Sequence, residues 1–223
     1  MKLYSYWRSS AAYRVRIALG LKSIPYEYVA INLLRDGGDQ RRADYLRLNP
    51  GGRVPTLVVE GQVIVQSMAI LEWLEERFPA TPLLPSDAFQ RARVRGLAQM
   101  IVSDIQPLQN LSVTEYLRDE GGWPPERVAA WLQRWVGAGM AAVERSLQES
   151  AQASPGLDAG FCVGEVPTLA DACLVPQCYA ARRFGVDPAG FPRIAAIEAR
   201  CLALEAFAAA VPERQPDAPP GGA

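Results

Sequence analysis

The chain has 223 residues, 49% of them hydrophobic and 21% charged, which is the balance of an ordinary globular protein able to bury a sizeable core. This composition excludes a disulfide-stapled miniprotein and a disordered acidic chain. The formal net charge is −1 and the 23 basic residues are scattered, so we expect no nucleic-acid partner. There is no histidine, which excludes Ser/His and Cys/His nucleophilic pairs and His-ligated metals. We expect no metal site, and any catalysis must use other groups.

The first 80 residues alternate between strand-like and helix-like periodicity. The predicted elements are, in order, strand 2–6, helix 13–21, strand 27–31, helix 41–48, strands 56–59 and 63–65, and helix 68–78. Ser9 or Ser10 can cap the first helix and Ser67 the last. Glu60-Gly61-Gln62 predicts a tight hairpin, so the sheet of this βαβαββα unit is mixed rather than purely parallel.

The rest of the chain shows only helical patterns, after the proline-rich stretch PATPLLPSD, which contains Pro79, Pro82 and Pro85 and includes the linker. Helices are predicted, in order, over 89–111, 125–149, 169–184 and 192–207. The fold class is therefore an α/β unit followed by an all-α helical bundle. The predicted boundaries are 1–80 for the α/β domain, 81–88 for the linker, 89–211 for the helical domain and 212–223 for an irregular tail, whose apolar surface is too small to anchor it by packing.

The four cysteines all lie in the C-terminal third and include no C-x-x-C pair, so we interpret them as buried thiols. If Cys173 and Cys178 share a helix, their side chains point about 140° apart, a poor geometry for a disulfide. This favours a reducing cytoplasm. Arg8 interrupts the apolar core that a signal peptide needs, and no apolar run approaches the length of a membrane span, so we expect neither secretion nor membrane insertion.

Val54-Pro55-Thr56 lies between a glycine pair and a predicted strand. A trans proline is the common outcome for an isolated X-Pro bond, and only the surrounding βαβαββα pattern favours cis. A cis bond would expose the backbone groups of Val54 to a peptide-like ligand lying along the sheet edge.

Two helix starts carry polar pairs that permit two interpretations. Gln66-Ser67 can be a plain cap or can bind an anionic carboxylate at the positive end of a helix. Ser9-Ser10 can likewise be structural, or a hydroxyl there can donate to a thiolate and lower its pKa.

The arginines near these positions also permit a structural and a functional interpretation. Arg14 and Arg16 are most simply a solvated or ion-paired helix face, whereas Arg8 lies beside the proposed anion site and is the better functional candidate. Thr168-x-x-Asp171 fits a capping box with Asp in place of the usual Glu, and we assign it no chemistry.

Several segments together resemble the zeta class of glutathione transferases, from Lys2 to about Pro219. They are SSAAYRVRIAL, NPGGRVPTL, QSMAILEWLEE, IQPLQNLSV, VPTLADACLVPQ and RQPDAP. IQPLQNLSV and the serine-rich helix start are much more specific than VPTL, which many thioredoxin-like proteins share. The resemblance implies a thioredoxin-like N-terminal domain, an all-helical C-terminal domain, glutathione as cofactor and a homodimer.

Carried over by position, the resemblance implies a glutathione site drawn from both halves of the chain. Its residues would be Ser9, Ser10, Ala11, Ala12, Tyr13, Arg14, Gln40, Val54, Pro55, Gln66, Ser67, Gln106, Asn110, Leu111 and Ser112. Ser9 would hold the glutathione sulfur. The family pattern has cysteine after the two serines, whereas this chain has Ala11, and Ala12 replaces the serine that commonly follows.

The activity that the resemblance implies is cis–trans isomerisation of maleylacetoacetate, a small dicarboxylate, to fumarylacetoacetate by reversible thiolate addition. The enzyme must stabilise the thiolate, which we expect of Ser9, Ser10 and the first helix, and must supply positive charge to the carboxylates. We expect Arg8 to supply that charge together with Arg183, with the adjacent Arg182 as the alternative.

Three other functions stay open at this point. They are isomerisation of maleylpyruvate, conjugation of glutathione to α-halo acids, and glutathione binding without turnover. The last stays open because Ala11 replaces the cysteine of the family pattern. We also expect Gln106 and residues 110–112 to approach the glutathione site, within one subunit or across a dimer interface.

Overall fold

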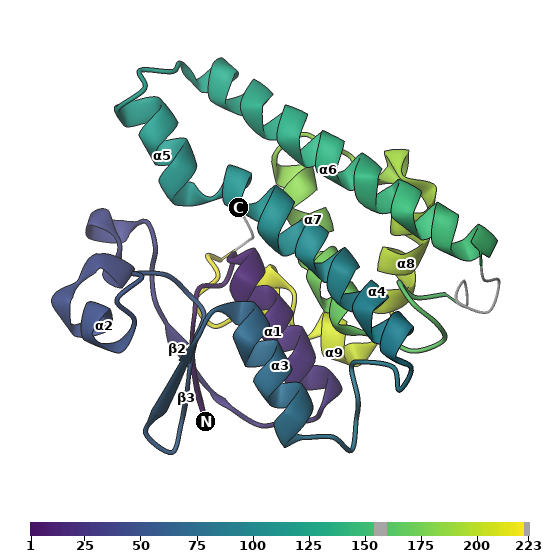
Figure 1. Ribbon diagram of the computed structural model, residues 1–223. Helices are drawn as coiled ribbons and strands as arrows, with labels where there is room; N and C mark the ends of the chain where they lie inside the picture. The colour runs from purple at the N-terminus through teal and green to yellow at the C-terminus, as the bar shows by residue number, and fades with distance from the viewer. Residues whose placement is uncertain (154–159, 221–223) are drawn as a thin grey trace. The chain divides into compact units, whose positions relative to one another are not determined.

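The computed structural model describes residues 1–153 and 160–220 (Figure 1). Contacts divide the chain into two compact units, one made of Met1–Leu83 with Ala203–Ala223 and the other of Leu84–Leu202. The predicted helical domain continued to residue 211, whereas the contacts join residues from Ala203 onward to the first unit. A long-range hydrogen bond gives the reason, because the Arg16 guanidinium donates to the carbonyl of Ala210 at 3.0 Å.

The sheet of the first unit has the predicted mixed topology. Its strands are β1 (Lys2–Ser5), β2 (Glu27–Ala30), β3 (Thr56–Val59) and β4 (Gln62–Val65), in the spatial order β2-β1-β3-β4. β1 pairs with β2 in parallel and with β3 antiparallel, and β3 pairs antiparallel with β4. Glu60 and Gly61 form the hairpin turn with φ angles of 51° and 80°, the positive values that a two-residue hairpin loop favours.

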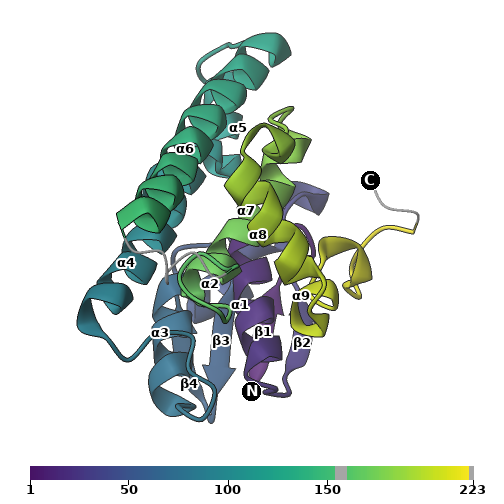
Figure 2. The same ribbon diagram turned by 90° about the vertical axis from the view of Figure 1, so that its right-hand side faces the viewer.

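The helices of the first unit complete the predicted βαβαββα order. They are α1 (Ser10–Leu21), α2 (Ala43–Leu48) and α3 (Ser67–Arg77), to which the returning chain adds the short α9 (Glu205–Ala208). α1 packs against both α3 and α9 (Figure 2). Because neighbours cover it on several sides, every residue of α1 from Ala12 to Leu19 is buried. Of the two interpretations of Arg14 and Arg16, a solvated or an ion-paired face, the solvated one is therefore wrong.

The proline-rich segment after α3 is fixed by a buried ion pair. Lys22 Nζ donates to Glu75 Oε2 at 2.8 Å and to the carbonyls of Phe78 and Thr81 at 2.9 and 2.7 Å. The same Glu75 oxygen accepts the backbone N–H of Leu83 at 2.8 Å. One lysine and one glutamate thus hold the whole turn that leaves the first unit.

The second unit is helical, as predicted, but two of the predicted helices are broken. Its helices are α4 (Ala88–Gln99), α5 (Leu111–Asp119), α6 (Pro125–Ala153), α7 (Leu169–Arg183) and α8 (Pro192–Leu202). The predicted helix 89–111 turns π-helical over Met100–Ile105 and then 3-10 helical over Gln106–Gln109. The predicted helix 192–207 ends at Leu202 because Leu204 is extended, with ψ 132°.

α7 forms the centre of the second unit and packs against α4, α6 and α8. Its predicted capping box is confirmed, since Thr168 Oγ1 accepts from the N–H of Ala170 and Asp171 accepts from that of Thr168. All four cysteines are buried thiols, as predicted. Among the helices that the structure describes, none is long and apolar enough to cross a membrane.

The C-terminal segment is more ordered than an irregular tail. Pro212–Arg214 forms a 3-10 turn, and Pro212 and Gln215 are buried. Gln215 Nε2 donates to the carbonyls of Ala209 and Val211 at 3.0 and 2.8 Å. Polar contacts therefore anchor this segment, whose apolar surface is too small to anchor it by packing. The last residues of the predicted tail, 221–223, lie outside the described residues.

Candidate active site

The turn between β1 and α1 places two serines at a helix N-terminus. Ser9 is the N-cap: its Oγ accepts the N–H of Ala12 at 3.2 Å, and its own N–H donates to the carbonyl of Tyr6 at 3.0 Å. Ser10 is the first helical residue. A hydroxyl that accepts one hydrogen bond can still donate another, and the N-terminal end of α1 favours negative charge beside it.

A second helix N-terminus meets α1 through Arg14. Arg14 Nη1 donates to Ser67 Oγ at 3.0 Å, and both side chains are buried. Ser67 was expected to cap α3, but it is the first helical residue, and Gln66 occupies the cap position with φ 69° and no side-chain capping bond. A buried guanidinium beside the N-terminus of α3 gives two sources of positive potential, which suits a carboxylate ligand.

The Val54–Pro55 peptide bond is cis. Two buried side chains hold the adjacent backbone: Tyr45 Oη and Asn49 Nδ2 both donate to the carbonyl of Arg53, at 2.7 and 2.8 Å. Burial raises the pKa of Tyr45, so its phenol stays protonated and remains a donor. The backbone of Val54 is thereby fixed at the start of β3, where a peptide-like ligand could pair with it.

Gln40 is buried with one half of its amide engaged. Its Nε2 donates to the carbonyl of Leu33 at 3.3 Å, whereas no donor from the part of the chain that the structure describes reaches its Oε1. A Cβ at Gly38 would collide with this amide, so glycine is needed there. A buried acceptor without a donor is costly unless a ligand supplies one, so Gln40 fits the expected peptide cofactor.

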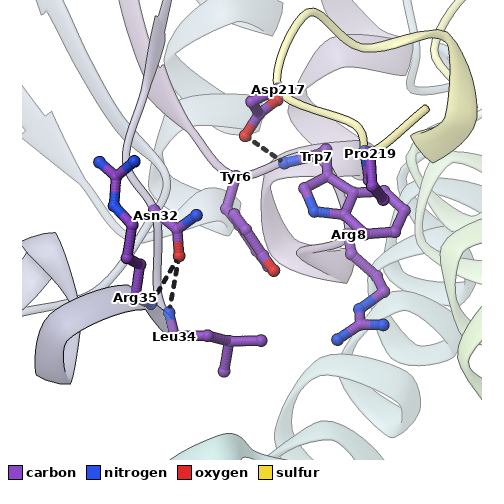
Figure 3. Close-up of a pocket in the computed structure, with 8 residues that line it drawn as sticks. All are labelled: Tyr6, Trp7, Arg8, Asn32, Leu34, Arg35, Asp217 and Pro219. Atoms are coloured by element: carbon purple, nitrogen blue, oxygen red, sulfur yellow. Dashed lines mark hydrogen bonds between the residues drawn. The ribbon is translucent and has the colours of Figure 1, made fainter. Parts of the chain in front are cut away.

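A pocket of about 430 Å³ adjoins the end of β1 (Figure 3). Its lining residues are Tyr6, Trp7, Arg8, Asn32, Leu34, Arg35, Asp217 and Pro219. Arg8 is half-buried, and its guanidinium carbon lies 5.1 Å from the centroid of the Trp7 ring. Asn32 Oδ1 accepts the N–H groups of Leu34 and Arg35 at 2.9 and 2.8 Å, which fixes the opposite wall. The lining thus carries the cations Arg8 and Arg35 together with the carboxylate of Asp217.

The candidate residues of the second unit lie at element ends. Gln106 begins the 3-10 helix, and Asn110 caps α5, its Oδ1 accepting the N–H of Ser112 at 3.1 Å. Arg183 is exposed at the end of α7, with its guanidinium carbon 5.3 Å from the Phe184 ring centroid. The adjacent Arg182 donates to Glu198 Oε1 at 2.7 Å.

Four residues around the site were not foreseen. Tyr45 and Asn49 position the cis-proline segment, and Tyr28 and Asp217 hold the end of β1. The turn Asn49-Pro50-Gly51-Gly52 was a usable signal for Asn49. Asp217 lies in the RQPDAP segment that carries part of the resemblance, but nothing local indicated its role, because its partners are about two hundred residues away in sequence.

Comparisons with known proteins agree with this geometry. A family model described as the glutathione S-transferase N-terminal domain matches residues 8–77. Maleylacetoacetate isomerase from Pseudomonas aeruginosa is 50% identical over 220 residues, covering 98% of this chain and 99% of the relative.

Two solved structures are similar over nearly the whole chain. One is the holo structure of maleylpyruvate isomerase, described as a bacterial zeta-class glutathione S-transferase, with a TM-score of 0.91, 44% identity and coverage of 97% and 99%. The other is maleylacetoacetate isomerase from Methylobacterium extorquens AM1 with bound malonate and glutathione, with a TM-score of 0.91, 41% identity and coverage of 98% and 100%. The chain belongs to the zeta-class glutathione transferase family.

Proposed function

We propose that this chain is a glutathione-dependent cis–trans isomerase that converts maleylacetoacetate to fumarylacetoacetate. The observation that carries the proposal is the adjacency of Arg8, in a pocket with a second arginine, to Ser9 at the N-terminus of α1. This arrangement places a cation for a dicarboxylate next to a hydrogen-bond donor for a thiolate. The similar enzymes named for this reaction and for maleylpyruvate support the same chemistry.

Glutathione is the cofactor that fits the first unit. Bound there, it supplies the thiolate that adds reversibly to the substrate double bond and permits rotation. Arg14, Ser67 and the start of α3 bind a carboxylate, the backbone of Val54 pairs with a peptide, and Gln40 Oε1 accepts a hydrogen bond. Gln66 completes this surface at the start of α3.

Ser9 holds the sulfur as an anion. Its hydroxyl donates a hydrogen bond to the charged sulfur, and the first N–H groups of α1 add favourable electrostatic energy at the same place. Ser10 and the segment from Ala11 to Tyr13 form the first turn of α1, which presents these groups. The alanine at position 11 leaves no protein thiol here, so stabilisation of the thiolate is the work of Ser9 and the helix.

Arg8 binds a substrate carboxylate, because a guanidinium fork matches a carboxylate and stays charged when partly desolvated. Arg183 is the proposed partner for the second carboxylate. Gln106, Asn110, Leu111 and Ser112 are proposed to approach the glutathione from the helical unit, within one subunit or across a dimer. The four buried thiols are compatible with a reducing cytoplasm, where we propose that the enzyme works.

Replacing Arg8 by alanine tests its role directly. We expect kcat/KM for the diacid to fall about ten- to hundredfold, the value of one charged hydrogen-bonded contact of about 1.5–3 kcal/mol. The Kd for glutathione, measured by titration calorimetry, should change far less. Unchanged turnover would make Arg8 an ordinary surface charge and Arg183 the main candidate.

Substrate assays decide between the open alternatives. The purified protein is given maleylacetoacetate, maleylpyruvate and a small α-halo acid, each with glutathione, and the rates are compared. The proposal expects the highest kcat/KM for maleylacetoacetate with no stable thioether. Faster turnover of maleylpyruvate would reassign the substrate, a stable thioether from the α-halo acid would favour a transferase, and binding of glutathione without any reaction would favour a binding protein.

We also propose a homodimer, on the strength of one residue. Phe89 in α4 is 88% exposed, and a large exposed aromatic residue is typical of an interface anchor. Sedimentation at micromolar concentration should give a species of twice the chain mass. Phe89→Ser should shift it toward the monomer, whereas Tyr116→Ser, a matched change at another exposed aromatic, should not. A wild-type monomer would contradict the proposal.

A further inference from the structure

The C-terminal segment returns to the end of β1 and is held there by one carboxylate. Asp217 Oδ2 accepts the backbone N–H of Trp7 at 3.0 Å, and Asp217 Oδ1 accepts the hydroxyl of Tyr28 at 2.6 Å. Burial raises the pKa of Tyr28, and its hydrogen bond to Asp217 adds to the shift, so the phenol remains a donor across the physiological range. Both carboxylate oxygens are therefore engaged by neutral donors from β2 and from the end of β1.

The backbone of Trp7 is held through both its N–H and its carbonyl group. Its N–H donates to Asp217, and its carbonyl accepts from Arg16 Nη2 at 3.0 Å. Arg16 in turn donates to the carbonyl of Ala210, at the start of the same C-terminal segment. Trp7 is thus clamped between a buried cation and an anion, although both belong to other parts of the chain.

The clamp adjoins the residues proposed to carry the reaction. Trp7 directly precedes Arg8, and Arg8 precedes the N-cap Ser9. Asp217 and Pro219 themselves line the pocket, and Figure 3 shows the hydrogen bond from the Trp7 N–H to Asp217 at its edge. Because the Asp217 oxygens already have donors, this negative group can stand in a pocket for a dianion without presenting an unpaired acceptor to it.

We propose that Asp217 is a positioning residue for the isomerase: it fixes the Trp7 peptide and, through it, the direction in which Arg8 enters the pocket. The proposal rests on the proposed substrate role of Arg8. Asparagine at 217 keeps the size and can keep both contacts in neutral form, because its oxygen can accept the Trp7 N–H while its N–H₂ donates to the Tyr28 hydroxyl, which then accepts. Alanine removes both contacts.

Steady-state kinetics on Asp217→Asn, Asp217→Ala and the exposed control Glu213→Gln test the inference. We expect kcat/KM for maleylacetoacetate to fall about tenfold or more in Asp217→Ala and by less in Asp217→Asn, with the Kd for glutathione within about threefold of wild type in both. Glu213→Gln should behave as wild type. Tyr28→Phe, which removes the other hydrogen bond of the same carboxylate but leaves Trp7 held, should lose less kcat/KM than Asp217→Ala.

A double-mutant cycle with Arg8→Ala separates positioning from general stability. If Asp217 acts through Arg8, Asp217→Ala should lower kcat/KM by less than about threefold once Arg8 is gone. Multiplicative losses in the double variant would overturn the inference, as would full turnover of Asp217→Ala beside an impaired Arg8→Ala. Full turnover of Arg8→Ala alone would overturn the role of Arg8 and the inference with it.

A chain ending at Pro216 provides a second variant without the two contacts of Asp217 if Asp217→Ala folds poorly. It removes Asp217 and Pro219 but keeps Gln215 and its bonds to the carbonyls of Ala209 and Val211. It should retain the cooperative unfolding of the full chain and glutathione binding, and lose kcat/KM as Asp217→Ala does. Wild-type turnover by this shortened chain would refute the inference.

Discussion

Arg16 is buried in the first unit and makes its hydrogen bonds to groups that are distant in the chain. Its guanidinium donates to the carbonyls of Trp7 and Ala210, both at 3.0 Å, and to Ser5 Oγ at 3.3 Å. Burial lowers the pKa of Arg16, yet the group stays charged because an arginine pKa ordinarily exceeds about 12. A buried cation needs acceptors. Here the carbonyls of Trp7 and Ala210 supply them, so Arg16 joins the two segments that carry these carbonyls.

At the residue scale, Ser9→Ala tests the stabilisation of the thiolate. The change removes one hydrogen bond to a charged sulfur, worth about 1.5–3 kcal/mol, so the thiolate-dependent rate should fall about ten- to hundredfold. Stopped-flow titration of the bound glutathione thiol should also show a raised pKa, because the anion loses a donor.

Two neighbouring changes provide the controls for Ser9. Ser10→Ala should have a smaller effect on the rate, since Ser10 is a helical residue rather than the cap. Ala11→Cys restores the family pattern at that position and should not be needed for turnover. Full activity of Ser9→Ala would move the role to Ser10 or to the backbone N–H groups of α1. If the natural chain is inactive and the Ala11→Cys variant is active, the proposal that the natural chain is an enzyme is wrong.

At the scale of elements, the turn after α3 depends on Lys22. Its pair with Glu75 is almost fully buried, with side-chain exposures of 1% and 8%. Lys22→Met leaves Glu75 as a buried charge without its cationic partner, so the free energy of unfolding should fall by about 3–5 kcal/mol. Urea denaturation followed by circular dichroism gives this value.

Lys2→Met is the matched control for this ion pair. Lys2 pairs with Glu27 at 3.2 Å, but both side chains are more than half exposed, at 53% and 58%. An exposed pair contributes at most about 1 kcal/mol, because water and salt screen it. Equal losses in the two variants would show that burial of the Lys22 pair has no special effect.

At the scale of the whole molecule, three of the four cysteines, Cys162, Cys178 and Cys201, link stability to pH. Burial raises the pKa of the Cys162 and Cys178 thiols well above the ordinary range, and the Asp171 charge adds to the effect on Cys162. Burial also raises the pKa of Cys201. In the unfolded chain these thiols titrate near about 8.5. Above that pH the unfolded state loses protons that the folded state keeps, so the free energy of unfolding should fall as pH rises.

Urea unfolding between about pH 7 and pH 9.5 measures this loss, since the tyrosines of the unfolded chain titrate only near about 10. Cys178→Ala should reduce the slope of stability against pH in this window. At pH 7.5 a water-soluble thiol reagent should label the folded protein slowly and the urea-unfolded chain at all four cysteines. Rapid labelling of the folded protein, or a stability independent of pH above about 8.5, would contradict the burial of these thiols.

Local patterns were sufficient for much of the fold. The alternation of strand-like and helix-like periods predicted the order βαβαββα, Glu60-Gly61 predicted the hairpin, and Thr168-x-x-Asp171 predicted the start of α7. Each is a short-range effect, in which the residues that interact are close in sequence. For the candidate site, the same local reasoning found Ser9 as a cap and Arg8 as a functional arginine, and the resemblance supplied the cofactor.

The sequence by itself determined the elements and the chemistry available at each helix start, because hydrophobic period, capping residues and turn residues act over a few neighbours. Only the tertiary structure decided that Arg14 and Arg16 are buried, that Gln66 rather than Ser67 stands at the cap of α3, and that Asp217 holds Trp7. The physical reason is that the environment of a charged side chain is set by partners elsewhere in the chain. An arginine on a helix is interpreted as solvated until its acceptors, here Ser67 for one and Ala210 for the other, are brought to it by folding.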